Sequence, residues 1–222
     1  MNNDIPREDG VELSAKARMI VERATVHLTG KGGLGVRVGG DASHGTGIIL
    51  TAAHCIEYDT SGGMTLGDYC LERATTHEKK EIVTQVCAVE PVSDIAVLGE
   101  PDGQELYDEA VAFEEFCEGI HPVPISTAEP ELFKHFPIFV FTHHRTWIKG
   151  TAQLCRKDAP NLVIKAMIEA GTSGGAVVDE LGNLMAIVSQ SQDPPSLGST
   201  GSGPRPHRAL PVWVWDEITA SS

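Results

Sequence analysis

The sequence predicts an all-β protein, either a barrel or a sandwich. Short strand-like segments recur along the 222 residues, polar turns separate them, and long helical patterns are almost absent. The chain contains 23 glycines and 13 prolines, which agrees with many turns. A hydrophobic content of 41% is enough to fill a substantial core, and all-β proteins of this length often form one unit.

The N-terminal residues 1–23 are expected to form an extension before the strands begin. Residues 11–23 contain few β-branched residues and no glycine or proline, which favours a short helix. Four apolar residues are spaced to share one face of this helix: Val11, Ala15, Met19 and Ile20. The polar residues 1–10 lack the basic start and apolar stretch of a secretory signal, although a longer precursor is left open.

Five strands are expected in the first half of the chain, which we assign to residues 24–103. They are residues 24–28, 45–50, 64–73, 81–90 and 94–98. The glycine-rich stretch between the first two strands is expected to form turns. Residues 99–110 are acidic and rich in turn residues, so we place the boundary between the two halves there.

The second half, residues 104–222, is expected to resume with six strand-like segments. They are residues 123–126, 136–142, 146–154, 162–167, 176–178 and 184–189. Residues 192–208 are rich in proline, glycine and serine, which predicts a mobile loop.

The formal net charge of −14 argues against two kinds of partner. An acidic surface repels nucleic-acid phosphates and anionic lipids, so neither nucleic acid nor a membrane is expected. No spacing of histidines and cysteines indicates a metal site, and no cofactor is expected. The five cysteines show no close-paired spacing, which favours free thiols in a reducing compartment such as the cytoplasm: Cys55, Cys70, Cys87, Cys117 and Cys155.

Three chemically distinctive residues each stand at the edge of a strand-like run. Ser173 lies between glycines in a segment that alone would usually be an ordinary turn. His54 follows an apolar run, and Asp94 comes directly before another. A serine, a histidine and an aspartate are the parts of a hydroxyl nucleophile, its base and the carboxylate that orients the base.

The segments Ile48–Cys55, Asp94–Leu98 and Gly171–Gly175 resemble, in this order, the three signature segments of chymotrypsin/trypsin-like serine proteases. The bacterial HtrA-type protease domains, which need no zymogen processing, are the most similar in style. The resemblance covers roughly residues 22–215. It implies two six-stranded antiparallel Greek-key barrels with the active site at their junction. It also implies a short C-terminal helix near residues 210–218, with its tryptophans packed on the body.

The resemblance assigns a role to each member of the triad. Ser173 is expected to be the nucleophile, His54 the general base and acid, and Asp94 the group that holds the imidazole in the right tautomer. The loop Gly171-Thr172-Ser173 is expected to form the oxyanion hole, with the backbone N–H groups of its glycine and serine converging on the developing negative charge. The adjacent histidines 143 and 144 form a rival pair, but neighbouring strand residues face opposite sides, so they are not expected to act together.

Thr172 suggests how activity is controlled. Trypsin-like zymogens carry an aspartate at this place, which pairs with a new amino terminus after cleavage. This chain has no such aspartate and no Ile-Val-Gly-Gly start. We therefore expect activity without proteolytic activation, or control by a regulatory partner protein or a ligand.

Spacing back from Ser173 places Met167 and Ile168 at the specificity pocket, and the resemblance implies that Ser189 matches a family serine lining the substrate strand. The full set of expected substrate-binding residues is Met167, Ile168, Ala170, Ser189, Gln190 and Ser191. Met167 is expected near the floor of the specificity pocket, and the absence of an aspartate there disfavours an arginine or lysine preference. Val188 stands where glutamate-specific relatives carry histidine. A small or medium apolar residue before the scissile bond is the remaining preference. The alternative is that Met167 and Ile168 belong to the barrel core.

The function expected from these residues is a serine endopeptidase that acts on protein or peptide substrates through an acyl-enzyme. One alternative is a catalytically inactive barrel that serves as a peptide-binding or regulatory module. Another is the same machinery acting on a non-peptide ester.

Overall fold

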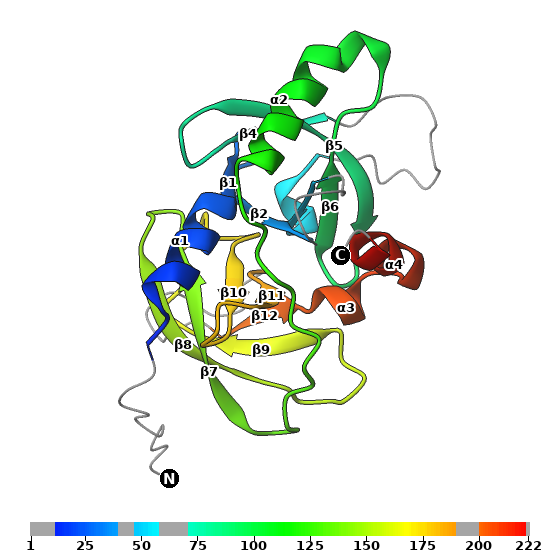
Figure 1. Ribbon diagram of the computed structural model, residues 1–222. Helices are drawn as coiled ribbons and strands as arrows, with labels where there is room; N and C mark the ends of the chain where they lie inside the picture. The colour runs from blue at the N-terminus through cyan, green and yellow to red at the C-terminus, as the bar shows by residue number, and fades with distance from the viewer. Residues whose placement is uncertain (1–11, 40–46, 58–70, 190–199, 221–222) are drawn as a thin grey trace.

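Two six-stranded antiparallel sheets form the body of the protein in the computed structural model, which describes residues 12–39, 47–57, 71–189 and 200–220. Figure 1 shows the first sheet in the upper half of the view and the second in the lower half. The first sheet closes into a barrel in the order β1-β2-β3-β6-β5-β4. Its strands are β1 (Thr25–Leu28), β2 (Leu34–Val38), β3 (Ile48–Thr51), β4 (Leu71–Thr75), β5 (Glu81–Glu90) and β6 (Ile95–Gly99).

The second sheet has the order β11-β10-β7-β8-β9-β12. Its strands are β7 (His135–Phe141), β8 (Trp147–Gln153), β9 (Asn161–Lys165), β10 (Ala176–Val178), β11 (Leu184–Ile187) and β12 (Thr200–Pro204). Just beyond β11, the N–H of Ser189 donates to the carbonyl of Ser202 on β12 at 3.0 Å, which brings the two edge strands together. The predicted all-β class with two six-stranded, barrel-like sheets is confirmed.

A shared apolar core joins the two sheets. It contains Val36 and Leu50 from the first barrel, Phe139 and Phe141 from the second sheet, and Val214 from the C-terminal helix. Each sheet also has a core cluster of its own. Because burying these side chains removes their apolar surface from water, the shared cluster holds the junction between the sheets together.

The strand β2 was not predicted, because its glycines were interpreted as turns. All five of its residues are buried. Gly35 has no room for a side chain, since a Cβ there would lie 2.6 Å from Cγ2 of Ile49. Arg37 is also buried, and its guanidinium donates to the carbonyl of Ile120 at 2.7 Å. The glycine thus allows close packing inside a strand.

The prediction of a loop over residues 192–208 is wrong for its second part. Residues 190–199 lie outside the described part of the chain, and β12 and the short helix α3 (Pro206–Ala209) occupy most of the rest. All five residues of β12 pair with β9. Gly203 lies so close to the core that a Cβ would approach Cδ1 of Ile164 to 2.3 Å. Small residues therefore let this edge strand pack tightly.

The predicted N-terminal helix is present as α1 (Ala15–Ala24), but its buried face differs from the prediction. The hydroxyl of Ser14 caps the helix by accepting the N–H of Ala17 at 3.1 Å. The buried residues of α1 are Ala17, Val21 and Ala24. Met19 is 51% exposed, and Val11 lies outside the described residues.

The helix α2 (Tyr107–Glu118), which follows the short 3₁₀ turn η2 (Gln104–Leu106), was missed by the sequence analysis. Figure 1 shows it lying across the first barrel. Its buried residues Phe113, Phe116 and Cys117 join the core cluster of that barrel, although they lie beyond residue 103. Acidic residues in its first turn are favourable at a helix N-terminus.

The C-terminal helix α4 (Val212–Ala220) packs with Val214 and Ile218 buried. Trp215 is partly buried against the shared core, but Trp213 is 66% exposed, so the expected packing holds for only one of the two tryptophans. Within the described residues, no helix is both long and apolar enough to cross a membrane.

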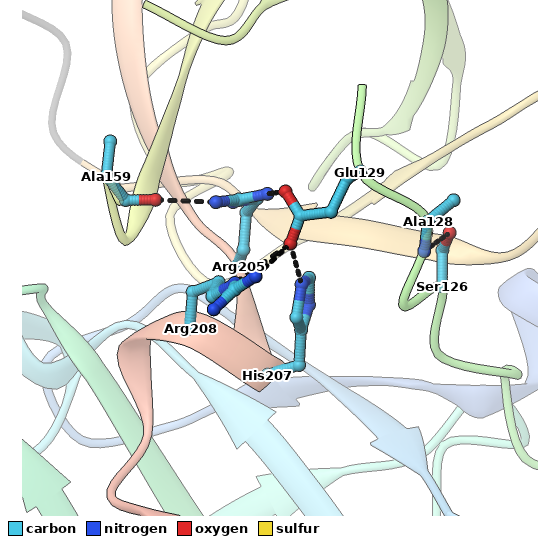
Figure 2. A network of polar contacts seen from close by, with 7 residues as sticks. All are labelled: Ser126, Ala128, Glu129, Ala159, Arg205, His207 and Arg208. Carbon is cyan, nitrogen blue, oxygen red and sulfur yellow. Dashed lines mark hydrogen bonds and ion pairs between the residues drawn. The ribbon is translucent and has the colours of Figure 1, made fainter. Parts of the chain in front are cut away.

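A charged network fastens the segment before β7 to the end of β12 and to α3 (Figure 2). The carboxylate of Glu129 accepts hydrogen bonds from Arg205 at 2.9 Å and from Arg208 at 2.6 Å, and it contacts His207 at 3.3 Å. Arg205 is fully buried and also donates to the carbonyl of Ala159 at 2.7 Å. The pairing offsets part of the cost of burying the guanidinium.

Candidate active site

His54 lies where β3 ends at the junction of the two sheets. The apolar strand is followed by the 3₁₀ turn η1 (Ala53–Cys55). Both neighbours of His54 in this turn are buried, whereas the imidazole is 34% exposed. The buried strand therefore fixes the backbone, and the turn presents the ring at the surface.

Asp94 holds the imidazole from the start of β6. Its Oδ2 lies 2.7 Å from Nδ1 of His54, and its Oδ1 accepts the backbone N–H of the same histidine at 2.9 Å. The hydroxyl of Ser189 donates to Oδ2 at 2.5 Å. An ionised carboxylate only accepts hydrogen bonds, so Nδ1 carries the proton. Nε2 is then the ring nitrogen that can transfer a proton to or from a substrate or a nucleophile. Asp94 has a φ of +60°, so its backbone adopts the left-handed conformation, which is uncommon for residues other than glycine.

The carboxylate changes the acid–base behaviour of the histidine. The hydrogen bond to Asp94, helped by the side chain of Cys55, raises the pKa of His54 to about 10. Burial alone would raise the pKa of Asp94, but hydrogen bonds from His54 and Ser189 outweigh it and lower that pKa. Each of the two shifts thus favours the charged form of its group in the presence of the other.

The loop that carries Ser173 is fastened to both sheets. The N–H of Leu34 on β2 donates to the carbonyl of Ser173 at 2.7 Å. On the other side, the N–H of Gly174 donates to the carbonyl of Val188 at 2.7 Å. Gly174 has a φ of +81° and fits against Leu34 so closely that no side chain could be added. The loop is thus positioned by backbone contacts.

Two backbone N–H groups of this loop are available to a ligand. In the described part of the chain, no hydrogen bond uses the N–H of Gly171 or of Ser173. The N–H of Thr172, which was included in the expected oxyanion hole, instead donates to the carbonyl of Glu169 at 3.3 Å. The glycine and the serine are therefore the better candidates for binding an oxyanion.

The loop that carries Ser173 and the turn that carries His54 both pack against Gly33. A Cβ on Gly33 would lie 2.6 Å from Sγ of Cys55, the neighbour of the histidine, and 2.9 Å from the carbonyl of Ser173. Among the described residues no hydrogen bond joins the serine hydroxyl to the imidazole. Catalytic hydrogen bonds are often long before substrate binds, so this geometry is compatible with a triad.

The expected substrate-binding residues fall into two groups. Met167 is 60% exposed, so the barrel-core alternative does not hold for it, while Ile168 packs against the core of the second sheet. Ala170 is exposed, and Ser189 is buried beside Asp94. Two residues lie outside the described part of the chain: Gln190 and Ser191.

The two adjacent histidines correct the expectation that they face opposite sides. His143 and His144 lie on the turn between β7 and β8 rather than on a strand, and their ring centroids are 3.8 Å apart. Nδ1 of His143 lies 3.0 Å from Oγ1 of the fully buried Thr172. The strand-like pattern around these residues gave no sign of this contact with the Ser173 loop.

The described cysteines are free thiols, in agreement with their spacing: Cys55, Cys87, Cys117 and Cys155. Cys70 lies outside the described residues.

Comparisons with known proteins identify the family and the fold of the chain. Residues 33–187 match the family model of the trypsin-like peptidase domain. A serine endoprotease from Yersinia pestis superposes with a TM-score of 0.62 at 18% identity, over 95% of this chain and 68% of that chain. The HtrA-type protease AlgW superposes with a TM-score of 0.59 at 18% identity, over 91% of this chain and 63% of that chain. At this identity the two structures show a shared fold. No curated protein sequence matches the chain.

Proposed function

Because the chain belongs to the trypsin-like peptidase family, we propose that it is a serine endopeptidase in which Ser173, His54 and Asp94 form the triad. The observation that carries the proposal is the double contact between the aspartate and the histidine, next to a serine loop that is fastened to both sheets. The structure of AlgW, which contains a tripeptide, supports a peptide as the substrate class.

The proposed reaction follows from the positions of these groups. Once neutral, Nε2 of His54 takes the proton of the Ser173 hydroxyl, and Oγ attacks the carbonyl carbon of the peptide. The N–H groups of Gly171 and Ser173 bind the oxyanion, and each such donor contributes roughly 3–4 kcal/mol. The imidazolium then protonates the leaving amine. Water repeats the sequence on the acyl-enzyme and restores the serine.

A fluorophosphonate probe tests the nucleophile. We expect the wild type to be labelled, Ser173→Ala to remain unlabelled, and the control variant Ser126→Ala to be labelled like the wild type. Equal labelling of wild type and Ser173→Ala would refute the assignment. If neither the wild type nor a variant is labelled but a peptide still binds, the result supports the inactive peptide-binding alternative. The observation that favours this alternative is that no hydrogen bond joins the hydroxyl of Ser173 to the imidazole of His54 among the described residues.

The proposed substrate preference is a small or medium apolar residue before the scissile bond. The exposed Met167 and Ala170 offer no charge to a basic or acidic side chain. A peptide library should show alanine, valine or leucine favoured over arginine and glutamate at that position. Strong cleavage after arginine would contradict the proposal.

We also propose that the chain needs no proteolytic activation. The hydroxyl of Thr172 contacts Nδ1 of His143 at 3.0 Å, so a contact within the fold occupies the place where trypsin-like enzymes form an ion pair after cleavage. The purified chain should therefore react with the fluorophosphonate probe before any protease is added.

We also propose that the protein works in the cytoplasm. The free thiols of the described cysteines support a reducing compartment.

A further inference from the structure

Three side chains of the kinds that bind metal ions converge beside the Ser173 loop. His143 and His144 come from the turn between β7 and β8, and Glu169 comes from the segment after β9. One ligand atom of each residue lies within 4.8 Å of those of the other two. Nε2 of His144 already contacts Oε2 of Glu169 at 3.0 Å. Two imidazoles and a carboxylate are a common ligand set for zinc.

A small rotation of the side chains would bring the three ligand atoms to the separations of a tetrahedral site. Zinc–nitrogen and zinc–oxygen bonds of about 2.0–2.2 Å place neighbouring ligand atoms roughly 3.3 Å apart. The side chains of His144 and Glu169 are 62% and 66% exposed, so they can rotate without disturbing the core. Three protein ligands leave the fourth position to water.

The third ligand is oriented by a hydrogen bond behind it. Nδ1 of His143 contacts the hydroxyl of Thr172 at 3.0 Å, and Thr172 is fully buried. Histidines that bind metals are usually held by such a bond through the other ring nitrogen, which fixes the tautomer and the ring orientation. Nε2 of His143 is the nitrogen that remains for a metal.

The carboxylate among the three ligands favours a cation. The carboxylate of Glu169 supplies negative charge, and the protein as a whole carries a net charge of −14. The nearest cation in sequence, Arg145, is engaged with His77, at 2.5 and 3.2 Å from its two ring nitrogens. A divalent ion would replace the weaker contact between His144 and Glu169.

We propose that His143, His144 and Glu169 bind one divalent cation of the zinc class. The bound ion connects the β7–β8 turn to the segment directly before the oxyanion loop, where the carbonyl of Glu169 accepts the N–H of Thr172. The site can form whether or not Ser173 is a nucleophile, so it is tested independently of the proposed enzymatic activity.

Titration calorimetry with zinc chloride on the full chain tests the site. We expect one ion per chain, and an affinity at least tenfold weaker in His144→Ala and in Glu169→Gln. His135→Ala removes another exposed histidine, at the start of β7, and should bind like the wild type. Melting temperatures of the metal-free variants show whether each is folded. No binding below 1 mM, or unchanged affinity in the double variant His144→Ala/Glu169→Gln, would overturn the proposal.

Two further measurements identify the ligands. Cobalt(II) should give the weak visible bands of a nitrogen and oxygen site, whereas an intense thiolate charge-transfer band would show that cysteines hold the metal and would overturn the proposal. Thr172→Val keeps the side-chain shape but removes the bond to His143, so zinc affinity should fall by roughly 10-fold or more. Wild-type affinity in this variant would contradict the proposed support of His143.

Discussion

Gly174→Ala tests whether the close fit of the Ser173 loop against β2 builds the active site. A Cβ at residue 174 would lie 1.9 Å from the carbonyl oxygen of Leu34 and 2.5 Å from Oγ1 of Thr51. Both atoms are fixed, because the hydroxyl of Thr51 itself donates to that carbonyl at 2.6 Å. The added methyl group must therefore push the loop away from β2.

The expected loss of stability has three contributions. The left-handed backbone at φ +81° costs an alanine about 1–2 kcal/mol. Overlap in a packed interior costs about 1–3 kcal/mol. Loss of the hydrogen bond from Leu34 to the carbonyl of Ser173 costs about 0.5–1.5 kcal/mol. We expect the free energy of unfolding to fall by roughly 3–6 kcal/mol in all.

Gly32→Ala is the matched control. Gly32 has nearly the same backbone angle, φ +84°, but a Cβ there would meet nothing within 4 Å. Only the backbone cost of about 1–2 kcal/mol should remain. Urea unfolding followed by the fluorescence of the three tryptophans gives both free energies, and probe labelling gives the reactivity of Ser173. Equal losses in the two variants, with equal labelling, would refute the reasoning.

Two other predictions concern charge. Asp94→Asn removes the carboxylate that raises the pKa of His54 to about 10, so NMR titration of the ring should show that pKa falling toward 6.5. Peptide turnover should fall on the order of ten-thousand-fold. An unchanged pKa of His54 would contradict the assigned pairing. Hydrogen bonds from Arg205 and Arg208 hold the pKa of Glu129 at about 2 against burial, so its stabilising contribution is present above pH 4.5 and is lost as pH falls toward 2. Glu129→Gln should lower the free energy of unfolding at pH 7 by only about 1 kcal/mol, because the side chain of Glu129 is 41% exposed and its charge is screened by solvent. Urea unfolding at both pH values measures this loss. A difference between variant and wild type that persists at pH 2 would contradict the assigned role of the carboxylate.

Much of the fold could be predicted from the sequence, because strands with apolar composition and polar turns are local signals. The strand at residues 81–90 was predicted with its observed bounds, and the family segments gave the two-barrel arrangement. The predictions failed where packing overrides composition. Gly35 in β2 and Gly203 in β12 were interpreted as loop residues, although both lie in strands at places where neighbouring side chains leave no room for a Cβ.

The sequence by itself determined which residue types are available for the chemistry, since His54, Asp94 and Ser173 follow from short motifs at the edges of apolar runs. Only the tertiary structure decided which of them touch. It brings the histidine and the aspartate into a double contact, whereas among the described residues no hydrogen bond joins the hydroxyl of Ser173 to the imidazole. It also brings Glu169 to the histidine turn. Such contacts join residues from separate strands and loops, so their geometry depends on how the two sheets pack, which local composition and periodicity do not determine.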